Sequence, residues 1–102
     1  MALNGEYVAV TPVKNAFVVN IGDMFECWTN NKWKSTLHRV ANPPKDSDAS
    51  KRSRYSFPFF TGPNFDSLIE PISTCVTEEN PIKHKIMTAH AHLLIKIEKS
   101  KV

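Results

Sequence analysis

The chain has 102 residues, of which 41% are hydrophobic and 23% charged, with a net charge of +3. This composition is too apolar for a disordered chain and suits one small globular domain. The charge is mild and no Lys/Arg run alternates with aromatic residues, so we expect no nucleic-acid partner. No apolar run approaches the ~18–20 residues of a membrane span, so we expect no membrane partner.

The two cysteines predict a reducing compartment. Cys27 and Cys75 are far apart and belong to no C-x-x-C pair, as is typical of free thiols in a reduced protein. Residues 1–6 lack the basic and apolar regions of a signal peptide. We therefore expect a cytoplasmic protein.

The first third of the chain reads as two short strands and a helical turn. A turn signal at Asn4-Gly5 precedes a β-rich segment, 6–10, and a continuous apolar run at 16–21 is typical of a buried strand. Residues 24–28 suit one helical turn with Asp23 as its N-cap. Asparagines within 29–33 then favour a tight hairpin.

Two further strands and a helix are expected after this hairpin. Residues 35–40 and 54–60 are β-like, and the Pro/Asp/Ser-rich stretch between them, 42–53, should be an exposed loop. Helical spacing then appears between Pro81 and Lys99, at Ile82, Ile86, Ala89, Leu93 and Ile97. This pattern predicts an amphipathic C-terminal helix.

Polar side chains on the two β-like segments suggest a binding site. Because side chains alternate along a strand, His38 lies on one face of the first segment, and Arg54 and Ser56 share a face of the second. If these faces meet, an imidazole lies beside a guanidinium and a hydroxyl, which suits a metal ligand next to a carboxylate-binding fork. A lone histidine in an apolar strand is more often a hydrogen-bonded core residue, and this alternative stays open for His38.

Other chemistries find less support in the residues. His90 and His92 are two apart and fall on different sides of a helix, so together with His84 they suggest surface or interface histidines rather than a metal site. The chain has three glycines and no phosphate-binding loop motif. A basic interaction domain, suggested by the lysines near the C-terminus, is a minor alternative.

Several segments taken together carry a family resemblance. In order and spacing, residues 20–24, 28–30, 34–40, 54–60 and 85–94 resemble the C-terminal half of the isopenicillin N synthase-like 2-oxoglutarate/iron(II) dioxygenases. The resemblance implies a mainly β fold, part of a double-stranded β-helix (jelly roll) with a C-terminal amphipathic α-helix. Residues 1–72 would be the C-terminal half of the dioxygenase domain, and 73–102 a connecting loop and the C-terminal helix.

The same resemblance implies cofactors and site residues. His38 would be an iron(II) ligand, and Arg54 and Ser56 would form the R-x-S motif that binds 2-oxoglutarate. No catalytic residue is assigned. The function implied is that of an oxidoreductase, a dioxygenase that couples 2-oxoglutarate decarboxylation to oxidation of a small organic substrate.

The chain departs from the family in one respect, since it contains no H-x-D motif, which would supply the other two iron ligands. We therefore expect a fragment that is inactive alone and that associates with itself or with a complementing N-terminal half. The alternative is a non-catalytic 2-oxoglutarate-binding or regulatory module.

Overall fold

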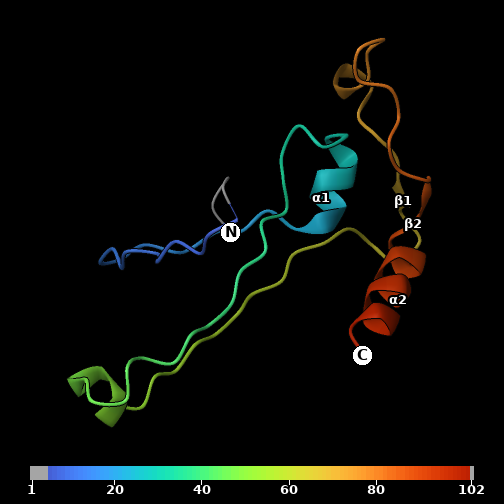
Figure 1. Cartoon of the computed structure of the whole chain (residues 1–102). Coiled ribbons are helices and arrows are strands. Elements are labelled where there is room, and N and C mark those ends of the chain that lie inside the picture. Colours follow the sequence, from blue (N-terminus) through green and yellow to red (C-terminus); the bar gives the residue numbers. More distant parts are fainter. Residues whose placement is uncertain (1–4, 102) are drawn as a thin grey trace. The chain divides into compact units, whose positions relative to one another are not determined.

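The computed structural model describes residues 5–101, which divide into two compact units. The first unit contains residues 5–8 and 37–61, and the second contains 9–36 and 62–101. The elements are α1 (Asp23–Trp28), β1 (Leu68–Ile69), β2 (Met87–Thr88) and α2 (Ala89–Lys99), with 3₁₀ turns η1 (Asp48–Lys51) and η2 (Ser73–Cys75) (Figure 1). No helix among the described residues is long and apolar enough to cross a bilayer. Asn4, part of a predicted turn, lies outside the described residues.

The core of the second unit lies where the two short strands meet α2. Strands β1 and β2 pair antiparallel, with Leu68 opposite Thr88 and Ile69 opposite Met87. Ile69 and Ala89 are buried, at 3% and 1% exposure. The amide of Ala89 also donates to the carbonyl of Ser67 at 2.9 Å, so the pairing continues into the first turn of α2. The first residue of α2 is thereby hydrogen-bonded to the residue that precedes β1.

The C-terminal helix is confirmed, although it begins at Ala89 rather than near Pro81. Met87 and Thr88, which come directly before the helix, form β2 instead. Thr88 also caps the helix, because its hydroxyl oxygen accepts a hydrogen bond from the amide of Ala91 at 3.2 Å. Lys96 and Lys99 lie in the last turn, where cations interact favourably with the helix dipole.

The predicted helical turn is also confirmed, as α1, but the prediction of a hairpin after it was wrong. Gly22 rather than Asp23 is the N-cap residue, and Asp23 is the first residue of the helix. Asn30 and Asn31 adopt left-handed φ values of 47° and 68°, as asparagine tolerates. They reverse the chain at the end of α1 instead of joining two strands.

The prediction of a mainly β structure needs correction within residues 5–101. No strand is formed by the segments 6–10, 16–21, 35–40 or 54–60, and the only strands described are β1 and β2. A strand needs a ladder of backbone hydrogen bonds with a neighbouring strand, and these segments form no such ladder in the described part of the chain. Their large side chains are accordingly exposed, for example Phe17 at 95% and Phe57 at 91%.

In the first unit, residues 37–61 run out to the 3₁₀ turn η1 and then back again (Figure 1). The loop predicted at 42–53 is indeed exposed apart from Ser47. Ser47 caps η1, because its hydroxyl oxygen accepts a hydrogen bond from the amide of Ser50 at 3.3 Å. The guanidinium of Arg39 lies 4.2 Å from the ring centre of Tyr7, a cation–π contact within this unit.

Candidate functional site

All three predicted site residues belong to the first unit. His38 precedes η1, and Arg54 and Ser56 follow it. Their side chains are exposed to solvent. Arg54 makes no ion pair with any residue in 5–101, so its guanidinium remains accessible to an external carboxylate.

The structure places these residues in one unit but does not show them around one cavity. A hollow of about 750 Å³ lies in the second unit, beside Phe25, Trp28 and Pro71. A smaller one of about 210 Å³ lies beside Val10 and Phe17. Neither is lined by His38, Arg54 or Ser56, so their convergence on a shared pocket stays a prediction.

The donors present suit 2-oxoglutarate better than iron. A guanidinium and a hydroxyl two residues apart can give a carboxylate two parallel N–H bonds and an O–H bond. A ferrous site of this class requires two histidines and a carboxylate. No three His, Cys, Asp or Glu side chains gather around a common point in residues 5–101. His38 alone therefore does not fit the metal.

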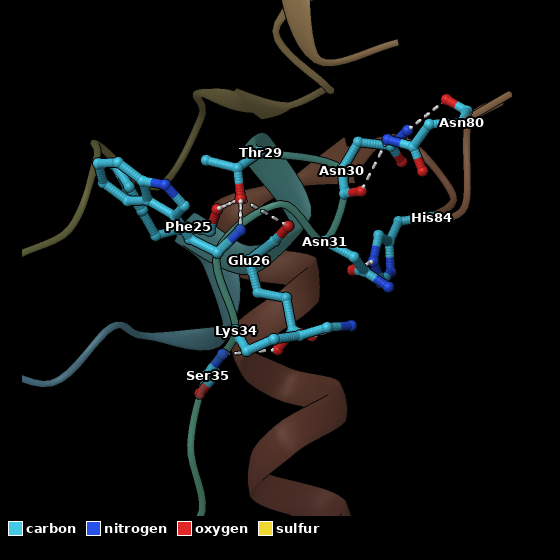
Figure 2. A network of polar contacts seen from close by, with 10 residues as sticks. Phe25, Glu26, Thr29, Asn30, Asn31, Lys34, Ser35, Asn80 and His84 are labelled. Carbon is cyan, nitrogen blue, oxygen red and sulfur yellow. Dashed lines mark hydrogen bonds and ion pairs between the residues drawn. The ribbon is translucent and has the colours of Figure 1, made fainter. Parts of the chain in front are cut away.

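A polar network in the second unit holds the start of the segment that leads to His38 (Figure 2). The Glu26 carboxylate on α1 accepts a hydrogen bond from the amide of Ser35 at 3.0 Å and pairs with the ammonium of Lys34 at 3.4 Å. The hydroxyl oxygen of Thr29 accepts from the amide of Trp33 at 3.1 Å. Residues 33–35 are thus tied to the helix that precedes them.

We expect Glu26→Ala to free this segment. The change removes a charge-assisted hydrogen bond worth about 1.5–3 kcal/mol, so hydrogen exchange at the Ser35 amide should accelerate by about tenfold or more. Glu26→Gln keeps an acceptor oxygen and should restore much of the protection. Glu98→Ala, an exposed change on α2, is the matched control. Equal exchange at Ser35 in wild type and Glu26→Ala would contradict the assignment.

Asn30 is the centre of the network and is fully buried, at 0% exposure. Its amide nitrogen donates to the carbonyls of Asn80 and Pro81, each at 3.0 Å, and lies 3.5 Å from that of Cys75. Its side-chain oxygen accepts from the amide of Lys83 at 3.0 Å. One side chain therefore connects the end of α1 to a loop some fifty residues later.

Two neighbouring contacts reinforce this connection. The side-chain nitrogen of Asn80 donates to the Asn30 carbonyl at 3.3 Å and to that of Cys75 at 2.9 Å. His84 Nε2 contacts the side-chain oxygen of Asn31. The local sequence pattern indicates a turn residue at Asn30 and a surface or interface histidine at His84. No local pattern identifies these partners, because they are about fifty residues apart.

Comparison with known proteins identifies the family. Residues 1–63, which include all three predicted site residues, match the 2OG-Fe(II) oxygenase superfamily. The chain is 43% identical over 79 residues to azadirone synthase of Melia azedarach, covering 78% of this chain and 21% of that protein. It is 36% identical over 95 residues to a homoarginine-6-hydroxylase of Oryza sativa subsp. japonica, covering 92% of this chain and 27% of that protein.

A fungal protein, the 2-oxoglutarate-Fe(II) type oxidoreductase of Aspergillus fumigatus, is 38% identical over 86 residues, which cover 84% of this chain and 24% of that protein. The chain thus spans between 21% and 27% of the length of these relatives. No solved structure gives a significant match. The match over residues 1–63 is more than half of the chain, and the chain therefore belongs to the 2OG-Fe(II) oxygenase superfamily.

Proposed function

We propose that this chain supplies the 2-oxoglutarate-binding portion of an iron(II)/2-oxoglutarate-dependent dioxygenase. The observation that carries the proposal is the R-x-S pair, Arg54 and Ser56, exposed and lying within the family match. The guanidinium of Arg54 would donate two hydrogen bonds to the far carboxylate of 2-oxoglutarate, and the Ser56 hydroxyl would donate a third.

His38 would contribute one nitrogen ligand to iron in the complete domain. The remaining ligands would come from polypeptide outside residues 5–101, supplied by a complementing N-terminal half that carries the H-x-D motif. The β-like segments 6–10, 16–21, 35–40 and 54–60 would then become strands of a jelly roll, with 1–72 forming the C-terminal half of the domain and 73–102 the connecting loop and helix. The complete protein would act in the cytoplasm on a small organic molecule.

A second candidate is a module that binds 2-oxoglutarate without catalysis. It is favoured by the donor set, since no group of three His, Cys, Asp or Glu side chains that could hold a metal ion occurs within residues 5–101. The two functions make different predictions about iron: a module of this kind binds 2-oxoglutarate equally well with and without the metal.

Calorimetry with 2-oxoglutarate tests the proposed site on the chain itself. Arg54→Ala should weaken binding by about ten- to a hundredfold, because a charge-assisted hydrogen bond contributes about 1.5–3 kcal/mol. Arg52→Ala removes the same charge two residues away and should leave binding within about twofold of wild type, as expected of an exposed surface charge. Equal affinities in wild type and Arg54→Ala would refute the site. Repeating the titration with ferrous iron on the chain joined to an N-terminal part that carries the H-x-D motif distinguishes the two candidate functions, because only a dioxygenase site is expected to bind 2-oxoglutarate more tightly with the metal.

A further inference from the structure

Residues 54–60 present aromatic side chains to solvent in the part of the first unit that returns from η1 (Figure 1). Tyr55, Phe57, Phe59 and Phe60 are 83%, 91%, 90% and 91% exposed. The segment contains no helix or turn and forms no strand ladder in the described part of the chain. A run of exposed aromatic residues of this kind is typical of a surface that binds another protein chain.

Three of these aromatic residues lie on one face of the segment when it is extended. Because side chains alternate along an extended chain, Tyr55, Phe57 and Phe59 point the same way. We call these three residues the aromatic stripe. Arg54 and Ser56 point to the opposite face, so an inference about the stripe does not rest on their assignment to 2-oxoglutarate.

The aromatic stripe is symmetric about Phe57, with one aromatic residue two positions before it and one two positions after it. Two copies can therefore pair antiparallel about a two-fold axis at Phe57. Tyr55 of each copy then lies opposite Phe59 of the other, and the two Phe57 side chains lie opposite each other. Directly opposite residues share a face of the sheet, and aromatic pairs in these positions stabilise the pairing of strands. The stripe is thus complementary to itself.

Pro58 determines which residues of such a pair exchange hydrogen bonds. Opposite residues in an antiparallel pair alternate between hydrogen-bonded and non-hydrogen-bonded positions. If the two Phe57 residues are hydrogen-bonded to each other, Pro58 lies opposite Ser56 in a non-hydrogen-bonded position, where its missing N–H is not needed. At the outer edge of the pair the same proline offers no donor to a third strand. Assembly therefore ends at two chains.

The charges of the segment agree with this arrangement. Arg54 is the one charged residue in the sequence 53–61. In the antiparallel register it lies opposite Phe60 of the second copy, and the two arginines are at opposite ends of the paired segments. No like charges face each other, although directly opposite like charges destabilise a strand pair.

We propose that two copies of this chain form a symmetric dimer through residues 54–60, paired antiparallel about Phe57. The interface is isologous, because the same residues contribute from both copies. In the complete dioxygenase domain proposed above, residues 54–60 are a strand of the jelly roll. The second copy and the complementing N-terminal half therefore compete for the same segment, and the dimer is the state of the chain without that half.

Sedimentation velocity on the full chain tests the dimer. From micromolar to millimolar concentration, the mass of the wild-type chain should rise from 11.6 kDa towards twice that value and no further. Phe57→Lys places two ammonium groups opposite each other at the axis and should weaken association by about tenfold or more. Phe17→Lys is the matched control, since Phe17 is 95% exposed in the second unit, and it should associate as wild type does.

Three outcomes of this experiment would overturn the proposal. They are a wild-type chain that stays monomeric, which would leave residues 54–60 to the N-terminal half alone, masses above two chains, and equal association of Phe57→Lys and wild type. Circular dichroism of Phe57→Lys should show unchanged helix content, because the position is exposed. A variant that loses helix is replaced in the comparison by Phe59→Lys, whose undiminished association would overturn the proposal equally.

Cysteine cross-linking tests the register. Under mild oxidation with diamide, Phe57→Cys should form covalent dimers, because the two positions are directly opposite. Thr61→Cys should form no more than wild type, which already carries Cys27 and Cys75, because two Thr61 residues are about 25–30 Å apart in this register. Efficient cross-linking through Thr61→Cys would indicate parallel pairing and would overturn the antiparallel dimer, as would the absence of cross-linking through Phe57→Cys.

Discussion

Replacing Asn30 by alanine is expected to destabilise the second unit by about 3 kcal/mol, since buried groups that lose their hydrogen bonds cost about 1–3 kcal/mol each and some relaxation is expected. The change leaves the carbonyls of Asn80 and Pro81 and the amide of Lys83 without their partner. It also places alanine, whose side chain makes no hydrogen bond to the local backbone, at a φ of 47°. The lost hydrogen bonds and the backbone strain both lower the free energy of unfolding.

Urea unfolding followed by tryptophan fluorescence measures this loss in the relevant unit, because Trp28 and Trp33 both lie in residues 9–36. Asn30→Gly removes the side chain but accepts the left-handed backbone, so the difference between the two variants separates backbone strain from lost hydrogen bonds. Asn64→Ala, at an exposed position, should change stability by less than about 0.5 kcal/mol. Wild-type stability in Asn30→Ala would show that the network contributes little.

Replacing His38 by alanine is expected to abolish turnover once the domain is complete. This prediction rests on the proposed function and uses the chain joined to the N-terminal part of a family member that carries the H-x-D motif. Succinate formed from 2-oxoglutarate is the measurement. The wild-type fusion should produce it, and His38→Ala should reduce it at least about a hundredfold, because such iron sites rely on three protein ligands.

His90→Ala is the matched control for this experiment. His90 is exposed on α2, and its ring lies 5.6 Å from that of Phe65. Its loss should leave succinate formation within about threefold of wild type, as expected for a surface change away from the site. Undiminished succinate formation in His38→Ala would show that His38 is not an iron ligand. The assignment of Arg54 and Ser56 would not be affected, because it is tested separately by 2-oxoglutarate binding.

Local patterns were sufficient to predict both helices. The apolar spacing of residues 81–99 predicted α2, and the short apolar run after Asp23 predicted α1. Hydrogen bonds inside a helix join residues four apart, so the information lies within a few turns of sequence. Five short segments taken together, among them the one with the R-x-S pair, predicted the family, which the match over residues 1–63 confirms.

Strand formation and helix boundaries depended on more distant residues. The β-like segments 35–40 and 54–60 have suitable residues for strands, yet they form none in the described part of the chain. A strand exists only beside a partner strand, and the β-propensity of its own residues does not show whether a partner strand is present. The start of α2 moved from Pro81 to Ala89 for a related reason, since Met87 and Thr88 pair with Leu68 and Ile69.

By itself, therefore, the sequence determined the family and the two helices, while the ligands it suggests for 2-oxoglutarate and iron stay a prediction. Only the tertiary structure decided that Asn30 binds a loop fifty residues away and that Asp23 lies between His92 and Lys96. The physical reason is the range of the interactions: helix formation and short motifs are local along the chain, whereas buried hydrogen bonds and ion pairs between elements exist only after the chain has folded back on itself.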